Sequence, residues 1–442
     1  MTRRRHGRLV AGLLVLPLAL AACSGGTDDT DGGDEGTGGE TAATEGGTLK
    51  LWHYESADGA MGIAWDEAIK VFEEETGATV EFERKAFEQI QQTAGMVLSS
   101  DEGPDIMEYN KGNATAGLLS SQGLLTDLTD VAEERGWTDM LPESIQTTAR
   151  YENGVMGSGP WFGVPNYGEF VTVYYNKAMF EEYGVEVPTT LTEMEDVMDT
   201  FVAAGVVPLG MAGAEYPAGQ LFYELALSKA DRDFVSAYQT YTDDVDFQAD
   251  PLKYGAETFD AWVKAGYVAQ DSASIKAEDM GVAFINGTTP MIVSGSWWYG
   301  RFVSEITGFD WGIFNFPGNT LNAGSSGNIW VVPENSANKE LAYEFIDITM
   351  RPEIQALLGN NGGLPLNADP ADLTDPKSQE LITAFNEVLD NDGLAFYPDW
   401  PVPGYYDVLV AAFQSLINQS KTPEEVLTEI GTAYDDGVAN IG

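Results

Sequence analysis

Residues 48–109 read TLKLWHYESADGAMGIAWDEAIKVFEEETGATVEFERKAFEQIQQTAGMVLSSDEGPDIMEY and decide the fold. The segments 48–54, 79–83 and 106–109 are apolar or alternate between apolar and polar residues, which predicts three short strands. The two stretches between them carry apolar residues at helical spacing and predict amphipathic helices. Strands that alternate with helices in this way are typical of βαβ units and of a sheet that is at least partly parallel.

The same alternation continues through the rest of the chain. Further strands are predicted at 171–176, 207–211, 289–293 and 328–333. Thr190 and Glu193 form a capping box at the start of one later helix, and Thr422 caps the last one. Open α/β sheets bind ligands beyond the carboxyl ends of their strands. The residues that follow strands are therefore the first candidates for a site: Tyr54, Glu55, Tyr109, Asn110, Asn166, Glu169, Glu215 and Tyr216.

The first residues predict export. A basic segment, residues 2–8, precedes an apolar run at residues 9–20, which is shorter than the about 20 residues that span a bilayer. We interpret residues 1–22 as a signal peptide. The run ends in Leu-Ala-Ala-Cys and resembles the bacterial lipobox, which implies lipidation of Cys23 and attachment to the membrane through that lipid. Residues 23–47 contain Gly, Thr and acidic residues without large apolar side chains, and predict a disordered tether.

The charge of the chain excludes several kinds of partner. Asp and Glu number 70 and Lys and Arg 22, a formal net charge of −48. Nucleic acids and anionic lipid head groups are recognised by basic patches, so we expect no nucleic-acid partner. The same charge disfavours phosphate-bearing solutes as ligands. An organism whose proteins are generally acidic, or that lives at high salt, explains the large negative charge better than a specific cationic partner does.

The supply of reactive side chains is small. Once the signal peptide is removed, His53 is the only histidine, and Cys23 is the only cysteine in the chain. A Cys–His nucleophilic pair and a zinc site of Cys and His ligands are therefore excluded, and a Ser-His-Asp triad could use only His53. We expect no catalytic residue, no metal site and no cofactor. Pairs of carboxylates leave a glycoside hydrolase open, although 70 acidic residues form such pairs by chance.

Aromatic residues are the remaining candidates for binding. The chain has 10 Trp, 19 Tyr and 20 Phe, several of them in Gly- or Pro-containing loops. Aromatic faces stack on the C–H surfaces of sugar rings, while carboxylates and amides bind the hydroxyls. Trp297, Trp298 and Tyr299 follow a predicted buried strand and a Gly-Ser turn, so at least one ring should face open space. The alternative for any single aromatic residue is that it belongs to the core.

Several short motifs, in this order, resemble the extracellular solute-binding proteins of the maltose-binding type, which serve ATP-driven (ABC) sugar importers. The resemblance covers nearly the whole chain from Thr48. Its carriers are Phe72-Glu-Glu-Glu-Thr-Gly77, Gly103-Pro-Asp-Ile106, Gly163-Val-Pro165, Tyr174-Tyr-Asn-Lys177, Phe284-Ile-Asn-Gly287, Gly295-Ser-Trp297 and Asn338-Lys-Glu-Leu-Ala342.

The resemblance implies an α/β, two-lobed, periplasmic-binding-protein-like fold of type II. Each lobe would hold a mixed or parallel sheet flanked by helices, with a hinge between the lobes. Lobe 1 is predicted to comprise 48–165 plus 329–363, and lobe 2 to comprise 166–328 plus 364–442. The hinge residues would be Val164, Pro165, Asn328 and Ile329.

The resemblance also places site residues in the cleft. It implies sugar contacts for Tyr54, Glu55, Glu169 and the pair Glu215 and Tyr216, and stacking for Tyr109 and Trp297. The last stacking aromatic of the family cannot be aligned, so Tyr397, Trp400 and Tyr405 are all candidates for it. The complete set of expected sugar-binding residues is Tyr54, Glu55, Tyr109, Asn110, Asn166, Glu169, Glu215, Tyr216, Trp297, Trp298, Trp330, Gly363 and Trp400.

Together these features imply a monomeric binding protein that captures a carbohydrate by hinge closure. It would hold the sugar at the outer face of the cell membrane and deliver it to the transmembrane subunits of an ABC permease. Two alternatives remain open at this stage. One is a lipid-anchored glycoside hydrolase, and the other is a binder of a non-sugar solute such as a polyol or a peptide.

Overall fold

The computed structural model describes residues 46–100 and 103–441. The predicted signal peptide, Cys23 and almost all of the predicted tether lie outside the described residues. The chain divides into two units, Met1–Ala43 and Thr44–Gly442, and the description below concerns the second. Within the described part of the chain, no helix combines the length and the apolar character needed to cross a membrane.

The first sheet of this unit confirms the βαβ pattern of residues 48–109. It has five strands in the order β2-β1-β3-β12-β6. β1 is parallel to both β2 and β3, whereas β12 is antiparallel to β3 and β6. The strands are β1 (Thr48–His53), β2 (Thr79–Arg84), β3 (Ile106–Tyr109), β6 (Val164–Pro165) and β12 (Ile329–Val331).

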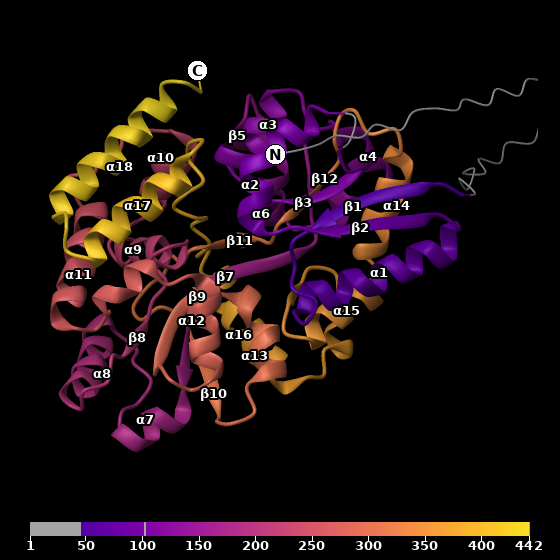
Figure 1. Cartoon of the computed structure of the whole chain (residues 1–442). Helices are drawn as coiled ribbons and strands as arrows, with labels where there is room; N and C mark the ends of the chain where they lie inside the picture. Colours follow the sequence, from indigo (N-terminus) through magenta and orange to yellow (C-terminus); the bar gives the residue numbers. More distant parts are fainter. Residues whose placement is uncertain (1–45, 101–102, 442) are drawn as a thin grey trace, which may run out of the picture. The chain divides into compact units, whose positions relative to one another are not determined.

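Helices cover both faces of the first sheet (Figure 1). Side chains alternate along its strands: Leu49, Leu51 and Ile106 pack toward one helix layer, and Met107 packs toward the other. The first layer contains α1 (Ala60–Thr76), α14 (Lys339–Thr349) and α15 (Pro352–Asn360), and the second contains α2 (Phe87–Leu98) and α3 (Leu118–Ser121). The neighbouring elements are α4 (Thr129–Glu134), α5 (Trp137–Met140), α6 (Glu143–Gln146) and the ribbon of β4 (Arg150–Glu152) and β5 (Val155–Trp161).

The second sheet has six strands centred on β7, which runs from Tyr167 to Asn176. Its main path is β10-β7-β9-β8, and β11 and β13 pair with the first half of β7. The other strands are β8 (Leu209–Gly210), β9 (Met291–Gly295), β10 (Trp311–Phe314), β11 (Gly324–Ser326) and β13 (Leu364–Pro365). Its helices are α7 (Lys177–Tyr183), α8 (Leu191–Ala203), α9 (Pro217–Leu227), α10 (Arg232–Thr240), α11 (Leu252–Ala265), α12 (Ala277–Ile285), α13 (Tyr299–Glu305), α16 (Pro376–Asp390), α17 (Tyr405–Ile417) and α18 (Pro423–Val438).

The chain passes between the two sheets at short connections. Asn166 alone separates β6 from β7, and Gly327 and Asn328 separate β11 from β12. The predicted hinge residues therefore lie at the crossings: Val164 and Pro165 form β6, Asn328 lies in the second connection, and Ile329 begins β12. The division into two sheets agrees with a two-lobed fold, while the lobe boundaries and the hinge stay predictions.

Local signals located helix ends better than strand ends. Both predicted capping boxes are present, at Thr190 with Glu193 and at Thr422 with Glu425. β7 begins four residues earlier than the strand predicted at 171–176, because its first residues pair with β11 and β13. Those partners lie far away along the chain, so no local pattern reports them.

Candidate functional site

A cavity lies between the two sheets and draws its lining from both of them. Its empty space is about 1030 Å³, the open mouth included. The structure brings eight of the predicted site residues together in its lining: Tyr54, Glu55, Asn110, Glu169, Tyr216, Trp297, Trp298 and Trp400.

Two predicted aromatic residues lie in the core instead of the cavity. Tyr109 is on β3 and packs into the layer that contains α2 and α3. Trp330 is on β12, is fully buried, and makes edge-to-face contacts with Trp65 and Phe345. The alternation of side chains along a strand directs both rings into a helix layer, and we remove them from the candidate site.

Three other predicted residues also lie outside the lining. The backbone carbonyl of Asn166 accepts a hydrogen bond from Gln355 (2.7 Å). The carboxylate of Glu215 accepts a hydrogen bond from the backbone N–H of Ala277 (2.8 Å) at the start of α12, which is a structural role. Gly363 approaches Leu358 so closely that a Cβ atom there would stand 2.4 Å from its side chain. The sequence placed these three residues near strand ends, and that position does not predict which contacts their side chains and backbone make.

One wall of the cavity is aromatic and is built at the end of β9. The ring of Trp297 lies against Gly295, where a Cβ atom would stand 1.9 Å from the ring, so only glycine fits. The indole N–H groups of Trp297 and Trp298 both donate to the hydroxyl of Tyr216, at 3.1 and 3.2 Å. Burial raises the pKa of Tyr216 to about 12, so the hydroxyl stays neutral and accepts both bonds. Trp297 itself is half-buried and faces the cavity.

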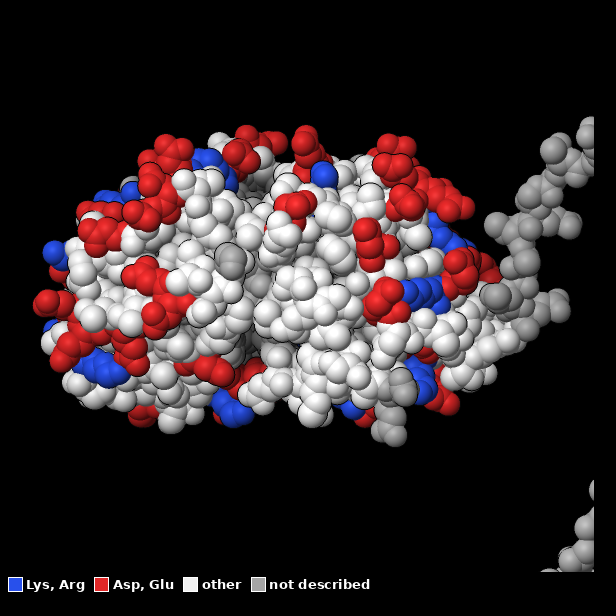
Figure 2. Space-filling model, turned by 90° about the horizontal axis from the view of Figure 1, so that it is seen from above, with Lys and Arg blue, Asp and Glu red and all other residues white. Residues whose placement is uncertain are grey.

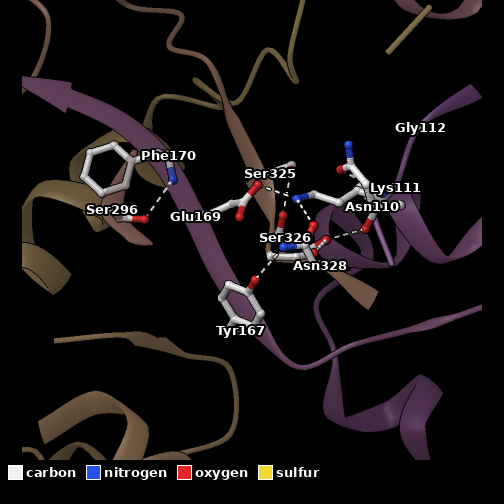
Figure 3. A network of polar contacts seen from close by, with 12 residues as sticks. Asn110, Lys111, Gly112, Tyr167, Glu169, Phe170, Ser296, Ser325, Ser326 and Asn328 are labelled. Atoms are coloured by element: carbon white, nitrogen blue, oxygen red, sulfur yellow. Dashed lines mark hydrogen bonds and ion pairs between the residues drawn. The ribbon is translucent and has the colours of Figure 1, made fainter. Parts of the chain in front are cut away.

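The floor of the cavity holds a buried lysine that sequence analysis missed. Lys111 follows β3 and is 2 % exposed. Its ammonium group donates to the carboxylate of Glu169 on β7 and to the side-chain oxygen of Asn328 (3.2 Å), as Figure 3 shows. Lys111 therefore joins the end of β3 to β7 of the second sheet and to the connection at Asn328.

The same network continues to Glu55. Asn328 donates to the hydroxyl of Tyr167 (2.9 Å), and Tyr167 donates to the carboxylate of Glu55 (3.2 Å). Burial, together with the charge of Glu169, raises the pKa of Glu55 to about 7. Burial also raises the pKa of Glu169, and Lys111 opposes that shift. The ionisation of Glu55 therefore changes near neutral pH.

Two further ionisable residues lie close to Glu55 without lining the cavity. Glu108 on β3 is 1 % exposed, and burial followed by the charge of Glu55 raises its pKa well above the ordinary value. His53 is fully buried, and burial followed by the charge of Arg84 lowers its pKa to about 3. The neutral imidazole accepts a hydrogen bond from the backbone N–H of Glu55 at 3.2 Å. His53 thus holds the turn that presents Glu55.

The C-terminal part of the chain supplies further aromatic residues to the lining, and the ring of Tyr397 lies 6.3 Å from that of Trp297. Tyr397 and Trp400 line the cavity, and the ammonium group of Lys111 lies 5.5 and 5.3 Å from their ring centroids. Tyr405, the third candidate for the unaligned aromatic, is 1 % exposed and belongs to the core. The neighbouring Tyr406 lines the cavity in its place.

Sequence reasoning missed half of the lining. The missed residues are Ser56, Gly59, Phe87, Lys111, Gln220, Glu278, Arg301, Asp399 and Tyr406. A usable signal existed for two of them. Lys111 directly follows the predicted Tyr109 and Asn110, and Asp399 lies in a Pro-Asp-Trp-Pro loop whose prolines disfavour a helix.

The side chain of Asn113, which does not line the cavity, makes a contact across the two halves. The side-chain amide of Asn113 donates to the backbone carbonyl of Gln239 (2.7 Å) and to the hydroxyl of Tyr241 (2.9 Å). Its oxygen accepts a hydrogen bond from the backbone N–H of Met156 (2.8 Å). One buried side chain therefore ties β5, close to the first sheet, to the end of α10 beside the second.

The arrangement is suited to holding a polar molecule with flat apolar faces. Aromatic rings offer stacking surfaces, and carboxylates, amides and phenol groups offer hydrogen bonds. Across the described ranges, no cluster of three or more His, Cys, Asp or Glu side chains could hold a metal ion. On the face in Figure 2, acidic side chains gather toward the edges, and the middle is largely without charge.

Comparison with known families and proteins agrees with this architecture. The family described as "Bacterial extracellular solute-binding protein" matches residues 67–384, well over half of the chain. A "Probable sugar-binding periplasmic protein" of Mesorhizobium japonicum is 25% identical over 72% of this chain and 76% of its own length. The "Diacetylchitobiose binding protein DasA" of Streptomyces coelicolor is 24% identical over 97% of both chains.

Solved structures share the fold. A "Chitin oligosaccharide binding protein" superposes with a TM-score of 0.78 at 20% identity and covers 89% of this chain and 99% of its own. A structure from work on xylan utilisation by Caldanaerobius polysaccharolyticus gives a TM-score of 0.77 at 20% identity, over 87% of this chain and 99% of its own. These neighbours have the two-lobed periplasmic-binding fold, which confirms the predicted fold class.

Proposed function

We propose that this chain, which belongs to the bacterial extracellular solute-binding protein family, captures a carbohydrate in its cavity for an ABC-type importer. The observation that carries the proposal is the pairing of half-buried aromatic rings with hydrogen-bonding side chains in one cavity. Trp297 and Tyr406 provide faces for sugar rings, and Glu55 and Asn110 provide partners for hydroxyl groups. The relatives named as binders of sugars, diacetylchitobiose and chitin oligosaccharides support this ligand class.

Capture works by closure of two lobes about the crossings. A ligand that contacts both lobes binds the closed form better than the open form and shifts the population toward it. We place the pivot of this movement near Lys111 and Asn328, and it is supported by the hydrogen bonds of Lys111 to Glu169 on β7 and to Asn328 in the second connection. The closed protein then docks on the transmembrane subunits of the permease and releases the sugar unchanged.

Attachment to the membrane is part of the same proposal. Lipidation of Cys23 would hold the protein at the outer face of the membrane, and residues 24–47 would give the folded part freedom to reach the permease. Replacement of Cys23 by Ser should release the protein from the membrane fraction and abolish labelling by fatty acid. We propose that the protein acts as a monomer.

One set of measurements distinguishes a sugar-binding protein from a glycoside hydrolase. The purified protein is screened by thermal shift against a panel of neutral mono- and oligosaccharides, polyols and peptides, because a ligand of the native state raises the melting temperature. Titration calorimetry then measures the affinity of each hit, and chromatography of the recovered ligand shows whether it is intact. A rise in melting temperature with a saccharide that is recovered uncut is the expected result. No shift with any saccharide, or a saccharide returned in pieces, would refute the proposal.

A further inference from the structure

Most of the charged side chains that line the cavity are acidic. Four carboxylates and two cations take part in the lining: Glu55, Glu169, Glu278, Asp399, Lys111 and Arg301. The balance matters for a ligand because a charge inside a partly dehydrated cavity is screened much less than a charge on the surface.

Both cations already have acidic partners inside the protein. Lys111 donates to Glu169, and both side chains are almost completely buried. Arg301 donates to Glu278 (2.7 Å) and to Glu305 (2.6 Å). A carboxylate on a ligand would therefore compete with existing ion pairs and would meet the remaining acidic residues.

Asp399, by contrast, lines the cavity as a half-buried residue. It makes no hydrogen bond or ion pair with another side chain of the described residues, and its own backbone N–H is the one bond that favours its charge. Burial raises the pKa of Asp399 to about 6, so the group is ionised at pH 7 and incompletely hydrated. An ionised, partly dehydrated carboxylate gains most from a donor that carries a positive charge.

Two uncharged side chains of the same lining have a buried polar atom without a hydrogen-bond partner among the described residues. The side-chain oxygen of Gln220, which can only accept, is one of them, and Gln220 is 4 % exposed. The hydroxyl of Tyr406, which can donate or accept, is the other. The titratable groups that face Asp399 are Lys111, Glu169, Tyr397 and Tyr406, and only Lys111 among them is a cation.

We infer that the cavity selects saccharides that carry a free amino group over neutral ones and rejects saccharides that carry a carboxylate, with Asp399 as the selecting residue. The inference rests on the proposed function and narrows it to one class of sugar. The ammonium group of the ligand donates to the carboxylate of Asp399, and its ring stacks on the aromatic wall. A uronic acid at the same position places two carboxylates against each other.

Three β-1,4-linked disaccharides that differ in charge test the inference: cellobiose, the disaccharide of unacetylated glucosamine, and cellobiouronic acid. Their affinities for the full-length chain are measured by titration calorimetry at pH 7 and low ionic strength. We expect the amino disaccharide to bind about tenfold or more tightly than cellobiose, and the uronate about tenfold or more weakly. Asp399→Asn should bring all three affinities together, whereas Asp407→Asn, on the exposed side of α17, should keep the wild-type order.

The pH dependence of the affinities is a second measurement. It distinguishes a charge effect of Asp399 from a purely structural role, because a structural role would not make the preference for the amino disaccharide depend on pH. At pH 5 the carboxyl of Asp399 is protonated, so the preference for the amino disaccharide should fall in the wild type. In Asp399→Asn the remaining dependence belongs to other residues such as Glu55 and Glu169.

The outcomes separate this inference from the proposed function. An amino disaccharide that binds no better than cellobiose, or a uronate that binds as well, overturns the inference in the wild type alone, whether or not the variant folds. An unchanged order in a folded Asp399→Asn variant removes Asp399 as the selecting residue. If none of the three binds while another saccharide does, the inference fails and the proposed function stands. If no saccharide binds at all, both fail.

Discussion

The ammonium group of Lys111 donates a hydrogen bond to the carboxylate of Glu169, and this pair joins the end of β3 to β7. The side chains are 2% and 5% exposed. A buried ion pair stabilises the folded state little more than a well-packed apolar pair would. Removal of one partner is costly, however, because it leaves the other charge buried and uncompensated.

We therefore predict that Lys111→Met lowers the free energy of unfolding by about 3–5 kcal/mol. The double variant Lys111→Met with Glu169→Gln should recover part of that loss, because no buried charge then remains. Urea unfolding at pH 7 measures both. Lys70→Met is the matched control, since Lys70 forms an exposed ion pair with Glu67 and its loss should cost less than about 1 kcal/mol. Equal effects of the two Lys→Met substitutions would contradict the role of Lys111.

Two tryptophans should separate binding from stability. Trp297→Ala removes a stacking face from the cavity and should weaken saccharide affinity by about 1–3 kcal/mol with little change in melting temperature. Trp330→Phe opens space in the core beside Trp65 and should lower the melting temperature with little change in affinity. Calorimetry of binding and of unfolding on both variants decides the assignment. A Trp297→Ala protein that binds as tightly as the wild type would remove this residue from the site.

Gly295 should be required for binding for a steric reason. The Cβ atom of an alanine at this position would stand 1.9 Å from the ring of Trp297, so the ring must leave its position on the wall. Gly295→Ala should therefore reduce affinity at least as much as Trp297→Ala. Gly219→Ala in α9 is the control, because among the described residues no atom other than those of the adjacent residues and the backbone of its own helix lies within 4 Å of the added methyl group. That substitution should preserve affinity and leave stability equal or slightly higher. If Gly295→Ala binds the saccharide as tightly as the wild type, the ring of Trp297 can leave its position without loss of affinity.

The stability of the protein should fall as the pH rises from 5 to 8. The pKa of Glu55 is raised to about 7, that of Asp399 to about 6 and that of Glu224 to about 8, chiefly by burial. An acid whose pKa is higher in the folded state binds its proton more tightly there, so its contribution is complete at low pH and is lost as the pH passes the folded value. Thermal unfolding across this range should show a declining melting temperature.

Substitution at Glu55 tests that explanation. Glu55→Gln removes one of the titrating groups, and the decline between pH 5 and 8 should become shallower. Glu353→Gln, at an exposed position of α15, should keep the wild-type profile. A melting temperature that rises with pH in this window would show that the buried acids do not control the profile.

The sequence predicted the architecture because its signals for secondary structure are local. Capping boxes at Thr190 and Thr422 and the strand pattern of residues 48–109 agree with the structure. The expectation that strand ends line the site placed Tyr54, Glu55 and Asn110 correctly in the cavity lining.

Side-chain direction was the limit of sequence analysis. Tyr109 and Asn110 are adjacent, yet one packs into the core and the other faces the cavity, because successive side chains point to opposite sides. Glu215 and Tyr216, in the turn before α9, also differ, since Glu215 binds the start of α12 while Tyr216 lines the cavity. Asp399 and Gln220 reach the cavity through long-range packing, which no local pattern reports.

The amide of Asn113 has a consequence for the time that cargo spends inside. The proposed separation of the two lobes would break its bonds to Gln239 and Tyr241, and water would have to replace them, because buried polar groups without partners are strongly disfavoured. The dwell time of a captured molecule would then depend in part on how fast solvent reaches a single side chain that does not line the cavity.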